Sequence, residues 1–270
     1  MEELINLISN AVIKDSGFEG NIPIEFKITD CIREDIENYY KNNNHQNTFQ
    51  DFSDLNGVFL SPNNTSEKAS IFINNKELQN SMDNNCQIIC TLYHELTHAI
   101  DYYRYCNDFF DGDYNKMWED SLTYSFYIWT EFNAKRKSYI FYRNFLQGDK
   151  SNSSESLDLI IKNEIPLHNN DIKNKIKNFN GGYDIIYYLI HYLARYMVWE
   201  EIFETTFANY KMIPNEVKSL LDNNLDKLYA YLKKHKEYPN AINDYEELSE
   251  IIEDINLNVT LYILENMPID

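Results

Sequence analysis

Two histidines with a glutamate between them are the residues of this chain whose types and spacing most directly permit chemistry. His94, Glu95 and His98 lie in the run His-Glu-Leu-Thr-His, which matches the pattern HExxH. On a helix the two imidazoles lie one turn apart and can converge on one metal ion, while the glutamate can take a proton from water that the metal activates. The pattern therefore predicts a Zn²⁺ site formed by His94 and His98, with Glu95 as its general base.

The sequence around this motif predicts a helix from Asn84 to about Arg104. On such a helix His94 and His98 point within about 40° of each other. The apolar residues centre on the opposite face, roughly 170° away; they are Ile89, Leu92, Leu96, Ala99, Ile100 and Tyr103. The helix is therefore expected to bury one side in a core and to turn both histidines toward whatever lies across from it. The alternative is that the two histidines are solvated or hydrogen-bonded on a polar helix face.

A zinc site of this kind needs a third protein ligand, with water in the fourth position. The next long helix is expected from Asn115 to about Leu146, and two of its glutamates compete for the role. Glu131 is favoured, because the small Ala134 beside it would let the two helices approach closely. Glu119 is the alternative. The two glutamates lie about 120° apart around a helix, so both can hardly face one ion.

Two polar residues have a second interpretation beside a functional one. Glu131 could be an ordinary helix glutamate paired with Lys135. Asp101 lies one turn beyond His98 and could orient a metal ligand, but a local pair with Arg104 explains it equally well.

Peptide hydrolysis also needs a group that stabilises the tetrahedral oxyanion. His191 is the candidate, with Arg195 one turn further along a run from 183 to 199 that is apolar almost all round. A buried, hydrogen-bonded and purely structural His191 is the favoured alternative.

Composition and charge narrow the class of protein. The chain has 270 residues with 43 acidic and 24 basic side chains, a formal net charge of −19. Such a chain repels phosphate backbones, so nucleic acid is not an expected partner. No run approaches the roughly 18 apolar residues of a membrane span, so no membrane is expected either. The amino terminus also lacks the features of a secretory signal.

The cysteines also favour a cytoplasmic protein. None of the four shows CxxC spacing. Cys86 and Cys90 lie four residues apart on a predicted helix and are expected to be packed thiols rather than metal ligands or disulfide partners.

Apolar alternation predicts a small sheet in the first part of the chain. The strand-like runs are Pro23–Thr29, Gly57–Leu60 and Ala69–Asn74, with helices expected near Glu2–Lys14 and Ile32–Lys41. After Asn74 the pattern is largely helical.

A small and polar stretch, residues 147–154, is the strongest candidate domain boundary. We therefore expect a helix-rich α+β fold, with a mixed-sheet domain at 1–148 and a helical domain at 149–270. Periodicity leaves Val259–Leu264 as either a helix or a strand.

An HExxH motif followed by a glutamate on a later helix resembles the gluzincin branch of the zincins, which are zinc metallopeptidases. More locally, Ile71-Phe-Ile-Asn74 followed by Thr91-Leu-Tyr-His-Glu-Leu-Thr-His98 resembles the ImmA/IrrE-type metallopeptidase domain. Glu131-Phe-Asn-Ala134 is similar to the segment that carries the third ligand in that family. The resemblance covers roughly residues 55–136. The run Lys135–Tyr139 and the helical second half depart from the family pattern.

This resemblance implies a zincin-like catalytic domain built from a small mixed sheet, an active-site helix and a third-ligand helix. It implies that His94, His98 and Glu131 bind zinc and that Glu95 is the catalytic base. It also implies that Ala69–Asn74, with Ile71 and Ile73, is an edge strand that aligns an extended peptide.

The function expected from the sequence is zinc-dependent hydrolysis of peptide bonds in a peptide or protein substrate. One alternative is a catalytically inactive or regulatory metallopeptidase-like protein that binds a metal and a partner. Another is a helical interaction protein in which HExxH occurs by chance.

Overall fold

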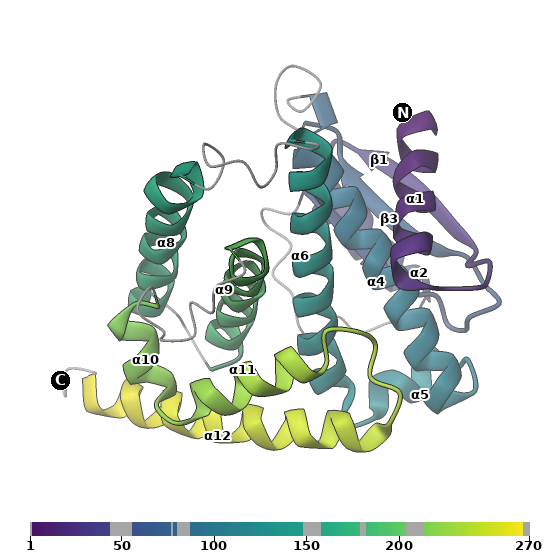
Figure 1. The fold of residues 1–270 in the computed structure, drawn as a ribbon. Helices are drawn as coiled ribbons and strands as arrows, with labels where there is room; N and C mark the ends of the chain where they lie inside the picture. The colour runs from purple at the N-terminus through teal and green to yellow at the C-terminus, as the bar shows by residue number, and fades with distance from the viewer. Residues whose placement is uncertain are drawn as a thin grey trace. The chain divides into compact units, whose positions relative to one another are not determined.

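The computed structural model describes residues 2–43, 56–76, 78–79, 87–147, 158–178, 182–203 and 213–266. The chain divides into two compact units, Met1–Asp120 and Ser121–Asp270, and Figure 1 labels most of their elements. This division differs from the expected boundary near residue 148. The helix Thr123–Gln147 packs with helices that follow it in the chain and so belongs to the second unit. The polar stretch at 147–154, of which only Gln147 lies within the described residues, therefore does not mark the division between the units.

The described part of the first unit contains a small sheet and several helices. In chain order its elements are α1 (Glu2–Ser16), β1 (Ile24–Thr29), α2 (Ile32–Asn43), β2 (Gly57–Leu60), β3 (Ala69–Asn74), α4 (Gln87–Phe110) and α5 (Tyr114–Glu119). The three strands lie in the order β1-β3-β2, with β1 parallel and β2 antiparallel to β3. The sheet is therefore small and mixed, as the sequence predicts.

Strand β3 is the central strand of this sheet. Its Ile71 pairs with Phe26 of β1 on one side and with Phe59 of β2 on the other. Ile71 and Ile73 are both buried. The prediction that these two residues belong to an edge strand is therefore wrong, because both hydrogen-bonding sides of the strand are already paired. The edge strands are β1 and β2.

Alternation along the strands gives the sheet two covered faces. Helix α2 covers one of them through a buried cluster of Ile32, Ile36, Val58, Leu60 and Phe72. Helix α4 contacts β2 and β3 on the face where Ile71 and Ile73 lie. The close approach of β2 to α4 depends on Gly57, because a Cβ at this position would lie 2.6 Å from Thr91 Cγ2.

Helix α1 packs along α4 and is fixed to it by polar contacts. The Tyr93 hydroxyl of α4 donates a hydrogen bond to the carboxylate of Asp15. Arg104 donates to the carbonyl oxygen of Ser16 at 3.0 Å, and its guanidinium lies over the Phe18 ring. These contacts hold both halves of the long helix α4 against the rest of the first unit.

A left-handed turn ends α4. Asp111 and Gly112 have φ values of 53° and 78°, and Asp113 then caps α5 by accepting from the backbone N–H groups of Asn115 and Lys116. The single helix expected over 115–146 is in fact two helices. Asp120 adopts an extended conformation that ends α5, and the next helix begins at Thr123.

The described part of the second unit is helical. Its elements are α6 (Thr123–Gln147), the π-helical turn η2 (Ile160–Glu164), α8 (Ile165–Asn178), α9 (Gly182–Phe203), α10 (Asn215–Leu221), α11 (Asn224–Lys234) and α12 (Ile242–Asn266). Helix α9 packs against α6, α8 and α12 and is buried on several sides, as its apolar composition predicts. The undecided run Val259–Leu264 is helical and belongs to α12.

The structure bears out a helix-rich α+β fold. Among the described residues, no helix combines the length and the apolar character that crossing a membrane requires. Cys31 and Cys106 are free thiols, and Cys86 lies outside the described residues.

Candidate metal centre

The two motif histidines converge on one point beside α4. The Nε2 atoms of His94 and His98 are 2.9 Å apart, and their rings meet edge to face with centroids separated by 4.5 Å. Two ligands on one tetrahedral zinc ion, with bonds of about 2.0–2.1 Å, lie roughly 3.3–3.4 Å apart. The two nitrogens therefore need to separate only slightly to receive one ion between them.

The remainder of α4 supports this orientation of the histidines. The residues that the helical wheel assigns to the opposite face are buried or nearly so; they are Ile89, Leu92, Leu96, Ala99, Ile100 and the half-buried Tyr103. His98 is itself buried, with 6% of its surface exposed, and His94 is half-buried. Burial of the apolar face fixes the rotation of α4, and this rotation in turn fixes the direction of both imidazoles.

Glu95 is buried and held by the sheet. Its Oε2 accepts a hydrogen bond from the backbone N–H of Phe59 at 2.8 Å. Asn74 donates its N–H to the carbonyl oxygen of Asn56, so the backbone groups of every second residue from Asn56 onward bond to β3. Phe59 lies between two such residues, and its backbone N–H and carbonyl therefore point away from β3. The carboxylate of Glu95 therefore sits at the free edge of β2.

Sequence reasoning missed this role of β2. The signal for it was Gly57, because a glycine within a strand often marks a close approach of another element. Here the approaching element is α4, which carries both Thr91 and Glu95 next to the position of the absent Cβ.

Aromatic side chains line the neighbourhood of His98, and the sequence analysis did not foresee them. The ring of Tyr102 lies 6.1 Å from that of His98, 5.2 Å from that of Phe59 and 5.7 Å from that of Trp118. The indole nitrogen of Trp118 donates to Ser61 Oγ at 3.2 Å. These contacts place α5 and the end of β2 around the histidine pair with an apolar lining.

Two further candidates of the first unit differ in burial. Asp101, one turn beyond His98, is buried with 2% of its surface exposed. Glu119 on α5 is exposed. Within the described part of the first unit, no carboxylate or thiol joins the two imidazoles closely enough to complete a three-residue metal site. The first unit therefore presents the two histidines and the glutamate of the motif, and its described residues do not include a third ligand.

The second unit contains a buried glutamate–histidine pair. Glu131 of α6 is buried, and its Oε2 lies 2.8 Å from the Nε2 of His191 on α9. Burial lowers the pKa of His191 to about 4. The Glu131 carboxylate raises this pKa but offsets only part of the effect of burial. The imidazole is therefore neutral at pH 7, and it donates its Nε2–H to the carboxylate.

A second histidine of this unit is also held by a charged partner. Arg195, one turn beyond His191 on α9, donates from Nη1 to the Nδ1 of His168 at 2.6 Å. Burial and the adjacent guanidinium lower the pKa of His168 to about 3. No pattern in the sequence singles out His168, because its segment of α8 is polar and its partner lies on another helix.

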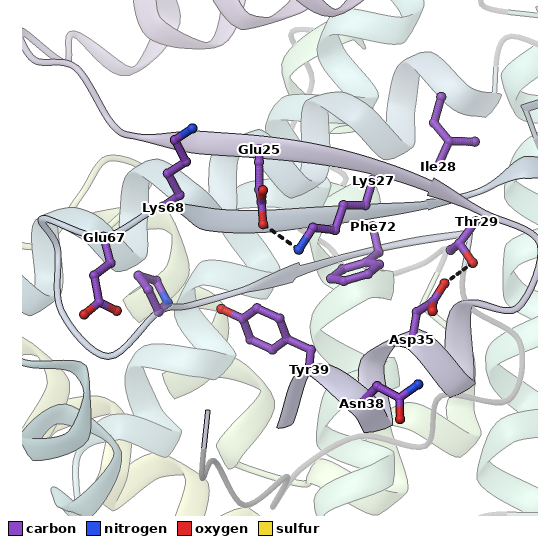
Figure 2. A pocket seen from close by; sticks show the side chains of 11 residues that line it. Glu25, Lys27, Ile28, Thr29, Asp35, Asn38, Tyr39, Glu67, Lys68 and Phe72 are labelled. Carbon is purple, nitrogen blue, oxygen red and sulfur yellow. Dashed lines mark hydrogen bonds and ion pairs between the residues drawn. The ribbon is translucent and has the colours of Figure 1, made fainter. Parts of the chain in front are cut away.

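A separate hollow of about 490 Å³ lies on the α2 side of the sheet and is lined by residues of β1 and α2 (Figure 2). Two of its charged side chains, Lys27 and Glu25, pair with each other. Lys27 Nζ lies 2.5 Å from Glu25 and 3.2 Å from Ser70 Oγ, and it also lies over the Phe72 ring. The hollow offers a charge pair that is already closed, so it does not compete with the histidine pair as a reactive centre.

Comparison of the chain with protein-family models, with curated proteins and with solved structures found no match. The interpretation of the site therefore depends on its own residues.

Proposed function

We propose that the chain is a zinc-dependent metallopeptidase of the zincin type, in which His94 and His98 bind the metal and Glu95 is the general base. The observation that carries this proposal is the 2.9 Å approach of the two Nε2 atoms. It is supported by the position of Glu95 between them in the chain, buried and hydrogen-bonded to an edge strand.

For the third ligand we propose Glu131. A ligating carboxylate is normally buried and held by a hydrogen bond from an outer residue. Glu131 is buried and has such a partner in His191, whereas Glu119 is exposed. In this proposal His191 positions the carboxylate of Glu131. This assigns to His191 a positioning role in place of the oxyanion-stabilising role that the sequence suggested.

Bound zinc supplies the Lewis acidity that polarises a peptide carbonyl and makes water acidic enough to lose a proton near neutral pH. Glu95 accepts that proton and later delivers it to the leaving amine. The apolar lining formed by Tyr102 and Trp118 limits the access of bulk water to His98.

The substrate class that we propose is an extended peptide. Strand β3 is central and cannot accept another strand, but β2 is an edge strand and lies next to Glu95. The N–H of Phe59 already donates to Glu95, but its carbonyl points to the same side and can accept from a peptide, as expected at a non-hydrogen-bonded position of an antiparallel pair. A peptide that pairs with this edge would pass directly beside the general base.

Zinc content and peptide cleavage, measured together, test this function. We expect the double substitution His94→Ala and His98→Ala to remove one zinc ion per chain. Glu95→Gln should retain that zinc and lower the cleavage rate of a peptide library by about 10²–10⁴-fold, the usual contribution of a general base. Glu119→Gln is the matched control and should change neither quantity.

An unchanged zinc content in the double variant would refute the metal site. Zinc binding without cleavage that depends on Glu95 would instead indicate a regulatory or inactive metallopeptidase-like protein.

A further inference from the structure

A second group of metal-ligating side chains lies in the second unit, where α11 is followed by α12. The two helices lie side by side and run in opposite directions (Figure 1). His235 caps the C-terminus of α11, and Asp244 and Glu247 lie in the first two turns of α12. One donor atom from each of these residues lies within 4.8 Å of the others. The arrangement brings one imidazole and two carboxylates to one place.

His235 is held rigidly and lacks a partner for one ring nitrogen. Only 8% of its surface is exposed, and among the described residues its Nε2 has no hydrogen-bond partner. Its backbone N–H donates to the carbonyl oxygen of Tyr231 and its own carbonyl accepts from the Trp129 indole, each at 2.9 Å. Buried polar atoms without a partner are uncommon, because burial removes them from water without a replacement hydrogen bond, and each one calls for an explanation.

The nearest carboxylate oxygen is too far away to serve as that partner. Asp244 Oδ1 lies 3.6 Å from His235 Nε2, beyond the usual hydrogen-bond range. Two ligands on a tetrahedral ion with bonds of about 2.1 Å lie about 3.4 Å apart. The observed separation therefore fits two ligands of one ion better than it fits a hydrogen bond.

A cation already lies at these carboxylates. Lys234 Nζ is 2.9 Å from Glu247 and 3.9 Å from Asp244. The Lys234 side chain is 58% exposed, so its flexible stem can withdraw into solvent.

We propose that His235, Asp244 and Glu247 form a second metal site, which takes a divalent first-row transition ion such as Zn²⁺ and from which the Lys234 ammonium withdraws when the ion binds. Imidazole together with carboxylates is a donor set suited to this class of ion. The site ties the end of α11 to the start of α12. It lies wholly within the second unit and does not depend on His94 or His98.

Calorimetric titration with Zn²⁺ tests the proposal in the full chain carrying His94→Ala and His98→Ala. We expect one saturable site in this background. Replacement of outer-shell residues commonly weakens metal binding 10–100-fold, so the loss of a ligand in Glu247→Gln should weaken it at least about tenfold. The adjacent Glu246→Gln is the matched control and should leave the affinity unchanged. Lys234→Met removes the competing ammonium and should bind Zn²⁺ more tightly.

His235→Gln should also abolish the site. Because His235 is buried, His235→Gln could fail to fold, and in that case Glu247→Gln decides the question. The proposal is overturned if the background chain shows no saturable binding, or if Glu247→Gln and Glu246→Gln bind Zn²⁺ equally well. Failure of the first metal site gives a different result: the wild-type chain and the variant with His94→Ala and His98→Ala would then have the same zinc content.

Discussion

The carboxylate of Glu95 accepts a hydrogen bond from the backbone N–H of Phe59 at 2.8 Å. This contact joins the HExxH helix to the edge of the sheet, and it gives the general base a fixed orientation. A backbone donor is a particularly stiff support, because it moves only if the strand moves. In the proposed peptidase the same strand edge that holds the base also receives the substrate.

Phe59→Pro removes this N–H, whereas Phe59→Ala removes only the aromatic ring. Proline is tolerated on an edge strand where the N–H faces away from the ladder, as it does here. We expect Phe59→Pro to cleave peptides up to about 10²-fold more slowly than Phe59→Ala, because the base loses its orientation. Zinc content should be the same in both. Equal cleavage rates in two folded variants would show that the hydrogen bond does not position the base.

Gly57→Ala tests the close packing of β2 on α4. The added Cβ would lie 2.6 Å from Thr91 Cγ2, so we expect the free energy of unfolding to fall by about 1–3 kcal/mol, the usual range for overpacking. Thr91→Ser removes Cγ2 and should restore part of this loss in the double variant. Urea denaturation measures all three variants. If the effects of the two substitutions simply add, the proposed clash is not the cause.

Replacement of Glu131 distinguishes the two candidates for the third ligand. We expect Glu131→Ala to lower the zinc affinity more than any substitution of its hydrogen-bond partner. His191→Ala should lower it by about 10–100-fold, as is usual for residues that orient a ligand. Glu119→Ala should have no effect, because Glu119 is exposed. Competition with a zinc chelator gives these affinities. If Glu119→Ala lowers the zinc affinity strongly and Glu131→Ala leaves it unchanged, Glu119 is the third ligand in place of Glu131.

The folded chain should lose stability at acid pH partly through His168. Burial and the Arg195 guanidinium lower the pKa of His168 from 6.5 to about 3. Between these two values the unfolded chain binds a proton at this position and the folded chain does not, so stability falls as the pH falls from 6.5 toward 3. His168→Gln should show a shallower loss over this window in urea denaturation at a series of pH values. Parallel curves for the two proteins would argue against the lowered pKa.

The parts of the site that the sequence predicts correctly are those set by local spacing. The i, i+4 placement of His94 and His98 on an amphipathic helix requires nothing beyond the helix itself, and the structure confirms the buried face behind them. The three strands were likewise predicted, since their apolar alternation is visible in the chain.

Local sequence patterns do not predict which distant segments pair with each other. They suggest that Ala69–Asn74 is an edge strand of the sheet, yet this strand lies between β1 and β2. The apolar run Ile71-Phe72-Ile73 is a signal in the sequence, because a strand covered on both faces carries apolar residues at successive positions, and all three residues are buried. The hydrogen bond from Phe59 to Glu95 and the pair of Arg195 with His168 each join residues on different elements, and no spacing rule reveals them.

The two units divide at a different residue from the one that the sequence predicts, and the reason is similar. The polar stretch after Gln147 is conspicuous in the sequence, but the packing of α6 decides its unit. Trp129 and Phe132 of α6 are fully buried, and the Trp129 indole donates to the carbonyl oxygen of His235 in the second unit. The composition of the stretch after Gln147 does not locate the division between the units, because tertiary contacts determine the unit to which α6 belongs.

X-ray diffraction at the zinc absorption edge, from crystals of the chain saturated with Zn²⁺, shows whether the two motif histidines hold the metal. We expect an anomalous peak about 2.1 Å from the Nε2 atoms of both His94 and His98, with an oxygen of Glu131 as the third protein ligand. Peaks confined to other positions, with none between the two imidazoles, would contradict it.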